Sequence, residues 1–452
     1  MVAASYATFV DQIASEIAAG SLRPGDRLPP QREFAYAKGI AASTAGRVYA
    51  ELLRRGLVVG EVGRGTFVAG RNASDGPAAR EPQDGPIDLE FNFPTVAGQG
   101  RLIARSLAGL QRPDAMAAAV GPVTRRRLDA ARAVTAGFLA SPGVAGQGWR
   151  PVEDALVFTG SGRQSIAAAV STLVPVGGRL AVEAMTYPMV KSIAARLGVT
   201  TVPIALDAEG PRPDLVERAH RAGALQALYL QPVLHNPLGH TMGPERRRHI
   251  LRLAARLDIP IIEDMVYGFL GDGVPLAAEA PDRCLVVDSL SKRLAPGIAV
   301  GLLHVPRAIR DRVAATVRGG AWTVSPLALE AGMRLLADGT AAEVVQLKRA
   351  DARARQAIVA EALAEHDLHT DPRSYHVWLT LPEGWRSERF AAVAARAGIA
   401  ITPSSAFAVA PGHAPNAVRL ALGLPSHDEL RQAAQRLAGL LDRHPDDADV
   451  TE

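Results

Sequence analysis

Lysine is rare in this sequence, and one of its four lysines, Lys292, stands shortly after the apolar run Cys284–Val287. The stretch 288–301 reads DSLSKRLAPGIAVG. The other 46 of the 50 basic residues are arginines, so an arginine would serve in a purely electrostatic role. A lysine amine can lose its proton and attack a carbonyl group, which a guanidinium does not do. Lys292 is therefore a candidate Schiff-base lysine.

Polar residues follow several of the seven apolar strand-like runs between positions 155 and 305. The alternation of these runs with amphipathic helical segments predicts an α/β fold with a mostly parallel sheet and a ligand at the carboxyl ends of its strands. After the first run, the small residues of segment 159–164 lead into a helix and can cradle a phosphate. Further on come Tyr187, which can stack on a planar ring, and Asp264, which can bond a pyridinium nitrogen.

The order of these features is more specific than any one of them. Tyr, Asn-Pro-x-Gly, Asp-x-x-Tyr, Ser-x-Ser-Lys and Arg follow one another over about 230 residues. This order resembles fold type I, aspartate-aminotransferase-like proteins that depend on pyridoxal 5'-phosphate, and the resemblance covers residues 88–442. It implies that Lys292 binds the cofactor as a Schiff base and that Asp264 pairs with the ring nitrogen. It also implies that Asn236 and Tyr267 bond the phenolic oxygen and that Tyr187 stacks on the ring.

The same resemblance assigns the cofactor phosphate and the effector. Ser161, Gly162, Arg163 and Ser289 would hold the phosphate, Ser291 would belong to the same site, and Arg419 would bind the carboxylate of an amino-acid effector. One position departs from the pattern. Ala299 stands in PGIAVG where relatives carry an arginine that neutralises the phosphate. Arg293 and Arg163 are the alternatives for that charge, and segment 92–101 is a candidate lining of the effector pocket.

The first 70 residues predict a small helical module. Three helical segments are followed by two short β-rich runs around Gly63-Arg64-Gly65, which is the arrangement of a winged helix-turn-helix. The runs GSLRPGDRLPPQREFA, YAELLRRGLV and GRGTFV resemble the GntR-type DNA-binding domain. The resemblance implies DNA contacts by Arg32, Ser43, Thr44 and Arg47, and by Arg64 and Gly65 on the wing. The alternative is a helical module for protein contacts.

Composition bounds the remaining possibilities. Segment 71–87 is rich in glycine, proline and charged residues, which predicts a linker. The composition of residues 443–452 predicts a disordered acidic tail. We therefore expect domains at 1–70 and 88–442, the second with a smaller C-terminal α/β subdomain. A single cysteine excludes an intramolecular disulfide, and a net charge of +4 is too small to establish a nucleic-acid partner by itself. We expect a cytoplasmic protein without a membrane span or a metal site.

A winged helix joined to an aminotransferase-like domain resembles the MocR subfamily of GntR-type transcription regulators. The resemblance implies double-stranded DNA, an amino acid or amine effector and a head-to-tail homodimer as partners. It implies a regulator that senses pyridoxal 5'-phosphate or the effector. Two alternatives stay open: a working aminotransferase with an accessory DNA-binding domain, and a regulator that has lost the cofactor.

Overall fold

The computed structural model describes residues 6–23, 25–55, 57–61, 65–68, 86–141, 149–271, 273–410 and 412–443. The chain forms two compact units. The larger unit consists of Asn92–Ala357 and Thr370–Tyr375, and the smaller of Met1–Phe91, Ile358–His369 and His376–Glu452. Most of the expected linker and tail (69–85 and 444–452) lies outside the described residues, so the expected domain boundaries stay predictions.

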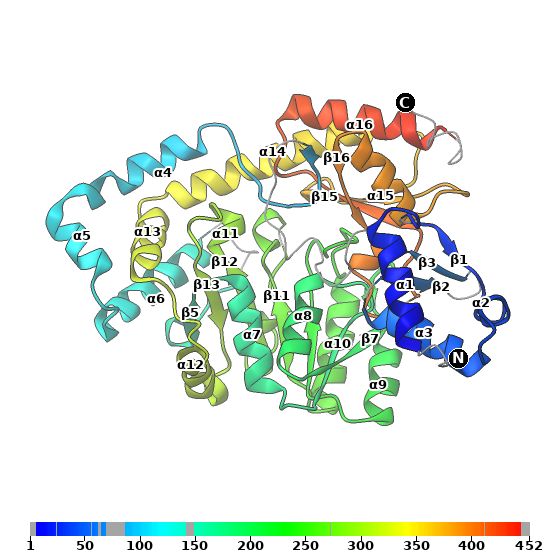
Figure 1. Ribbon diagram of the computed structural model, residues 1–452. Helices are drawn as coiled ribbons and strands as arrows, with labels where there is room; N and C mark the ends of the chain where they lie inside the picture. Colours follow the sequence, from blue (N-terminus) through cyan, green and yellow to red (C-terminus); the bar gives the residue numbers. More distant parts are fainter. Residues whose placement is uncertain are drawn as a thin grey trace. The chain divides into compact units, whose positions relative to one another are not determined.

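A seven-stranded sheet forms the centre of the larger unit (Figure 1). Its order is β5-β13-β12-β11-β10-β6-β7, and only β13 runs antiparallel to its neighbours, so the expected mostly parallel sheet is confirmed. The strands are β5 (Leu156–Thr159), β6 (Arg179–Glu183), β7 (Thr200–Ile204), β10 (Ala227–Leu230), β11 (Ile261–Asp264), β12 (Cys284–Ser289) and β13 (Gly301–His304).

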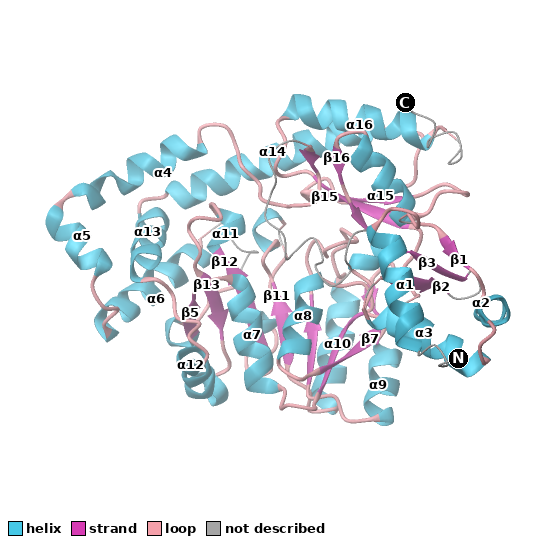
Figure 2. Cartoon of the chain, viewed as in Figure 1, coloured by secondary structure: helices cyan, strands magenta, loops and turns pink. Residues whose placement is uncertain are grey.

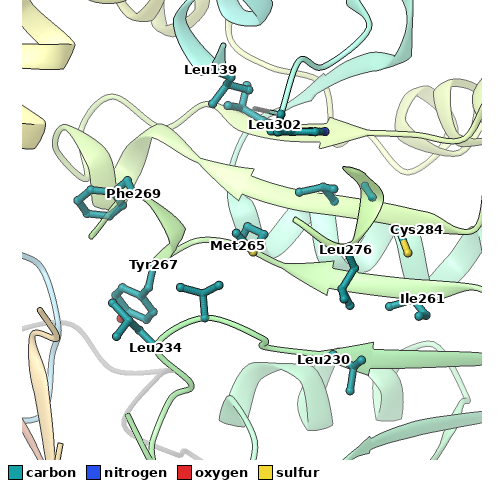
Figure 3. Packing of buried hydrophobic residues seen from close by; sticks show 14 of the residues in the cluster. Leu139, Leu230, Leu234, Ile261, Met265, Tyr267, Phe269, Leu276, Cys284 and Leu302 are labelled. Atoms are coloured by element: carbon teal, nitrogen blue, oxygen red, sulfur yellow. The ribbon is translucent and has the colours of Figure 1, made fainter. Parts of the chain in front are cut away.

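The helices of the larger unit lie against this sheet or pack on other helices (Figure 2). They are α4 (Gln99–Leu107), α5 (Pro113–Val120), α6 (Arg125–Leu139), α7 (Gly162–Leu173), α8 (Pro188–Arg196), α9 (Pro213–Ala222), α10 (Pro244–Arg256), α11 (Leu290–Arg293), α12 (Arg310–Gly319), α13 (Pro326–Ala337) and α14 (Thr340–Ala362). Two short strands, β8 (Leu206–Asp207) and β9 (Gly210–Pro211), form a separate pair. Because both faces of a parallel sheet are covered, its strands are almost entirely buried, apart from β7 at one edge. Leu230, Ile261 and Cys284 from neighbouring strands lie in the resulting core (Figure 3).

The smaller unit contains the expected winged helix-turn-helix. Its helices are α1 (Tyr6–Ala18), α2 (Gln31–Lys38) and α3 (Ala42–Arg54), and β1 (Arg27–Leu28), β2 (Val58–Glu61) and β3 (Gly65–Val68) form a sheet in the order β1-β3-β2. Val10, Phe34, Val48 and Leu52 form the core between the helices. The three helices and the hairpin are confirmed, and the short strand β1 is an addition.

The rest of the smaller unit is a second α/β layer. A four-stranded sheet has the order β14-β15-β18-β17, and a two-stranded sheet pairs β4 with β16. The strands are β4 (Ile87–Asp88), β14 (Leu368–His369), β15 (His376–Thr380), β16 (Ile399–Ala400), β17 (Thr402–Pro403) and β18 (Ala417–Ala421), and the helices are α15 (Ser387–Arg396) and α16 (His427–Leu441). The expected C-terminal α/β subdomain is thus present. Within the described ranges, no helix is both long and apolar enough to cross a membrane.

Candidate functional site

The parallel strands of the larger unit bring its candidate residues to one edge. Strands β5, β6, β10, β11 and β12 run in the same direction, so their carboxyl ends lie side by side. Ligands of such sheets bind at this edge. It carries Ser161, Gly162, Arg163, Tyr187, Asn236, Asp264, Tyr267, Ser289, Ser291 and Lys292.

The start of α7 forms a cradle beside Ser289. Gly301 of β13 pairs with Ser289 on one side and with Thr159 on the other, which brings β12 and the β5–α7 turn together. A Cβ atom at Gly162 would lie only 3.2 Å from the Cβ atom of Ser289, so this close approach requires glycine. Ser161 caps α7 by accepting a hydrogen bond from the Gln164 amide (3.3 Å). A helix N-terminus with neighbouring hydroxyls suits a phosphate.

Cationic side chains near this cradle are placed differently from expectation. Arg293 is buried, and its guanidinium lies 2.5 Å from the carboxylate of Asp288, so it neutralises Asp288 and is not a substitute at Ala299. The prediction for Arg293 was therefore wrong. Arg163 is exposed on the first turn of α7, directly after Gly162 of the cradle, and stays a candidate. Ser291 is half-buried, and its amide donates to the Ser289 hydroxyl (3.1 Å).

Asp264 is a buried carboxylate at the end of β11. It accepts a hydrogen bond from the Tyr229 hydroxyl (2.6 Å) and one from the Val266 amide (3.0 Å). Burial, and to a smaller extent the nearby carboxylates Asp288 and Glu183, raises its pKa to about 6. In the part of the chain that the structure describes, no lysine or arginine is bonded to Asp264. A buried carboxylate without a cation suits a protonated ring nitrogen, because the ligand then supplies the missing charge.

Asn236 lies in a turn whose backbone is fixed by Gln231. The Gln231 side-chain amide donates to the Asn236 carbonyl (3.3 Å) and accepts from the Asn236 amide (3.4 Å). The Asn236–Pro237 peptide bond is cis. Beneath the turn, the Glu183 carboxylate at the end of β6 accepts from the Gln231 amide (3.1 Å). These contacts hold Asn236 at the edge of the sheet.

Two tyrosines complete this side of the edge. Tyr267 is buried, and its hydroxyl accepts a hydrogen bond from the Asn92 side-chain amide (3.1 Å). Tyr187 directly precedes α8 and is half-buried. It contributes to the raised pKa of the buried Tyr229, so these hydroxyls are electrostatically coupled. Tyr229 was not predicted, because it reads as an ordinary core aromatic of β10.

Lys292 sits in the short helix α11 that follows β12. Its Nζ atom donates to the Asn92 carbonyl (2.5 Å) and lies 3.9 Å from the centroid of the Phe93 ring. The candidate lining 92–101 is therefore adjacent to the lysine. A second lysine, Lys348 of α14, contacts the same short helix. Its side chain is completely buried and donates to the Lys292 carbonyl (2.8 Å).

Arg419 belongs to the smaller unit. It lies in β18, is buried, and donates to the Thr402 hydroxyl (3.1 Å) and to the Glu90 carbonyl. Its guanidinium carbon lies 5.2 Å from the centroid of the Phe407 ring. Its expected role as an effector ligand stays a prediction.

Most of the residues expected to contact DNA belong to the helices of the winged helix. Ser43 and Arg47 are exposed and one turn apart on α3, Thr44 is half-buried, and Arg32 is exposed on α2. The opposite face of α3 is buried in the core. Gly65 opens β3 with φ +125°, and a Cβ atom there would lie 2.9 Å from Arg27 Nε, so the wing requires glycine. Arg64 lies outside the described residues.

Comparisons with known proteins match both parts of the chain. Residues 139–437 match the family "Aminotransferase class I and II", and residues 5–68 match "Bacterial regulatory proteins, gntR family". The HTH-type transcriptional regulator YdeF of Bacillus subtilis is 27% identical over 445 residues, which cover 97% of this chain and 94% of YdeF. The vitamin B6 salvage pathway transcriptional repressor PtsJ of Salmonella typhimurium is 26% identical, over 96% of this chain and 97% of PtsJ. The structure of an archaeal alanine:glyoxylate aminotransferase aligns with a TM-score of 0.70 at 22% identity, covering 90% of this chain and 98% of that one.

Proposed function

The chain belongs to the aminotransferase class I and II family, and we propose that it is a transcription regulator that binds DNA through its GntR-type domain. In this proposal the larger unit binds pyridoxal 5'-phosphate, the cofactor of this family, through a Schiff base at Lys292. The cofactor, or an amino acid or amine that reacts with it, is the signal. We place the protein in the cytoplasm, where DNA and the cofactor are both available.

One observation carries the cofactor assignment. Asp264 is a buried carboxylate that lacks a bonded cation in the described structure, and it shares its sheet edge with the reactive amine of Lys292. A protonated pyridine ring with an aldehyde substituent supplies a partner for each. The cradle at Ser161, Gly162 and Ser289 fits a phosphate on the same ligand. We call Asp264, Tyr229, Asn236 and Lys292 the ring end of the site, and Ser161, Gly162, Ser289 and Ser291 the phosphate end.

Each residue of the site then has a definite task. When bound, the cofactor supplies an aldehyde that captures amines. Asp264 holds a proton on the ring nitrogen, and Tyr229 holds the Asp264 carboxylate in place by donating its hydroxyl proton. Asn236 and Tyr267 donate to the phenolic oxygen, and Tyr187 covers the ring. At the phosphate end, hydroxyls and the N-terminus of α7 would bind the phosphate, which relatives bind with an additional arginine. Arg163 is the nearest candidate cation.

DNA recognition is the second half of the proposal. Ser43, Thr44 and Arg47 on α3 would enter the major groove, with Arg32 and the wing residues Arg64 and Gly65 on the backbone. We propose that two chains pair head to tail, so that two winged helices read paired half-sites. An effector would act by having different contacts in two arrangements of this dimer, since equal affinity for both shifts nothing.

The test combines a spectrum with a DNA-binding titration. Wild-type protein mixed with pyridoxal 5'-phosphate should gain a visible absorption band that Lys292→Ala lacks. A DNA site selected from random sequences should then be bound with an affinity that changes when the cofactor or an amino acid is added. A band without any change in DNA affinity would exclude the switch, and no band would exclude the cofactor.

A working aminotransferase is the second candidate, because Lys292, Asp264 and Asn236 all stand at the edge where catalysis would need them. Steady-state assays with several amino acids and a keto acid separate the two. Sustained turnover would favour the enzyme, and DNA binding without turnover would favour the regulator.

A further inference from the structure

A second lysine of this arginine-rich chain lies directly behind the first. Lys348 is on α14 and is completely buried. Its Nζ atom donates to the Lys292 carbonyl at 2.8 Å and to the Leu294 carbonyl at 2.6 Å. The contact joins residues 54 and 56 positions apart in the sequence. Two of the four lysines thus meet at one short helix.

The backbone carbonyls of Lys292 and Leu294 need donors from outside α11 because this helix is so short. The last four carbonyls of any helix lack partners within the helix, and α11 has only four residues. Within the helix, the Leu294 amide bonds the Leu290 carbonyl (2.7 Å), but the carbonyls of Lys292 and Leu294 lie at or beyond its end. The Gln99 side-chain amide also donates to Leu294 (3.0 Å). A buried carbonyl left without a donor costs about 1–3 kcal/mol.

Lys348 is itself held in place. The Tyr375 hydroxyl lies 2.8 Å from both the Lys348 carbonyl and the Asp351 carboxylate. Asp351 in turn accepts from Arg355 Nε (2.7 Å). Burial lowers the pKa of Lys348 to about 7, while the Asp351 charge favours the ammonium form. Asp351 on the same helix thus acts on the ammonium, and Arg355 and Tyr375 are linked to the ammonium through Asp351.

We propose that Lys348 is a positioning residue for Lys292: its ammonium fixes the end of α11 and so holds the Lys292 amine where it meets the cofactor aldehyde. This inference rests on the proposed cofactor function. Lys292 Nζ, as the free amine, adds to the aldehyde carbon, its two protons leave with the aldehyde oxygen as water, and a C=N bond remains. Lys348 takes no part in these bonds.

The geometry also explains why this position holds a lysine in a chain with 46 arginines. An ammonium is a compact donor that can direct two N–H bonds from one atom to two neighbouring carbonyl oxygens. A guanidinium is planar and larger, and it presents its donors as a fixed fork. We therefore expect Lys348→Arg to retain only part of the effect by which Lys348 positions Lys292.

Two ligands separate positioning from a general structural role. Pyridoxal 5'-phosphate reacts with Lys292, whereas pyridoxamine 5'-phosphate has the same ring and phosphate but no aldehyde. In Lys348→Met, the dissociation constant for the aldehyde should rise about tenfold, the effect of a lost charge-assisted hydrogen bond. The dissociation constant for pyridoxamine 5'-phosphate, measured by fluorescence quenching, should stay within about twofold of its value in the wild-type protein. Lys191→Met is the control, because Lys191 is half-buried and its pKa is likewise lowered by burial, to about 8, but it lies on α8.

The outcomes are distinct. If both constants rise together in Lys348→Met, the lysine has a general structural role and the proposal fails. If neither changes, Lys348 does not position Lys292. If Lys348→Met does not fold, Lys348→Gln, which keeps one neutral donor, is tested against the same two expectations. If the wild-type protein itself shows no visible band, the cofactor function fails first and the proposal falls with it. A wild-type band with an unchanged Lys348→Met constant refutes the positioning role alone.

Discussion

The two ends of the candidate cofactor site are equipped very differently. At the ring end, a buried carboxylate accepts a hydrogen bond from a tyrosine hydroxyl. A glutamine side chain donates to the backbone carbonyl of the asparagine, and a second lysine donates to the backbone carbonyl of the first. At the phosphate end, the structure offers hydroxyls and a helix N-terminus, while Ala299 adds only a methyl group and Arg293 is bound to Asp288. Because the ring end supplies a full opposite charge and a Schiff base, whereas the phosphate end supplies neutral donors, we expect most of the selective affinity to come from the ring end.

This difference has a consequence for a sensor. A cofactor that is held strongly at both ends has a low dissociation constant and stays bound even when its free concentration is low. One that depends on the ring nitrogen and a reversible Schiff base can leave when its concentration falls. We therefore expect occupancy to follow the cofactor concentration more closely here than in relatives with the phosphate arginine. The predictions below test this division, beginning with the ring end.

The largest effect is expected for Asp264→Asn. Removing one partner of a buried ion pair costs about 3–5 kcal/mol, so cofactor affinity should fall by about two orders of magnitude or more. Without cofactor, the same variant should be no less stable, because burial raises the pKa of Asp264 to about 6 and its charge is costly in the empty site. Absorption titrations and thermal unfolding check the two halves. Equal cofactor affinity in variant and wild type would show that Asp264 does not face the ring nitrogen.

The second effect has the opposite sign and concerns the phosphate end. Ala299→Arg should tighten cofactor binding by about ten- to a hundredfold, the range of one added charge-assisted hydrogen bond of about 1.5–3 kcal/mol. Ala299 precedes Gly301, which lies between Ser289 and Thr159, so the new side chain starts close to the cradle. Ala299→Gln is the control for size without charge. An arginine variant that binds no better would mean that the phosphate is already neutralised, with Arg163 the first residue to replace.

Sequence reasoning could propose the ring and phosphate residues because they stand at strand ends, and parallel strands bring their carboxyl ends together; their roles stay predictions. It failed where a contact depends on how helices pack. Lys348 lies in the long helix α14, and its bonds to Lys292 and Leu294 depend on tertiary packing that no local pattern encodes. Arg293 was misjudged because it is next to Lys292 in sequence, yet its side chain returns to Asp288. The rarity of lysine was the one signal that could have singled out Lys348.

Ser161→Ala tests the neutral part of the phosphate end and should have a smaller effect. The hydroxyl caps α7 and is expected to donate to the phosphate, so its loss should cost about 1 kcal/mol, or about a fivefold weaker cofactor binding. Thr172→Ala, at the far end of α7, is the control, because its hydroxyl bonds only the Ala168 carbonyl within the helix (2.7 Å). A loss as large as that of Asp264→Asn would reverse the division between the two ends.

The smallest effect on cofactor binding is expected beneath the ring end, at Glu183. Burial raises the pKa of this carboxyl to about 8 from 4.5, and it lies 3.3 Å from His235, whose pKa burial lowers to about 3. The folded protein therefore keeps a proton on Glu183 that the unfolded chain releases above pH 4.5. Its contribution to stability is lost as the pH rises from about 4.5 to 8.

Glu183→Gln removes this titration, so the stability of the variant relative to wild type should increase with pH across that window. The limiting slope is about 1.4 kcal/mol per pH unit for one proton. Glu263 and His235 titrate in both proteins without a resolved effect of the Glu183 charge, so they cancel in the difference. Burial raises the pKa of Asp264 and lowers that of His240, and the Glu183 charge acts to raise both pKa values, so their titration changes with it in the variant. Urea unfolding of both proteins at pH 5 and pH 8 measures the difference in their free energies of unfolding. A difference independent of pH would mean that Glu183 is ionised in the folded protein, paired with a protonated His235, and that the turn carrying Asn236 rests on an ion pair instead of a neutral hydrogen bond.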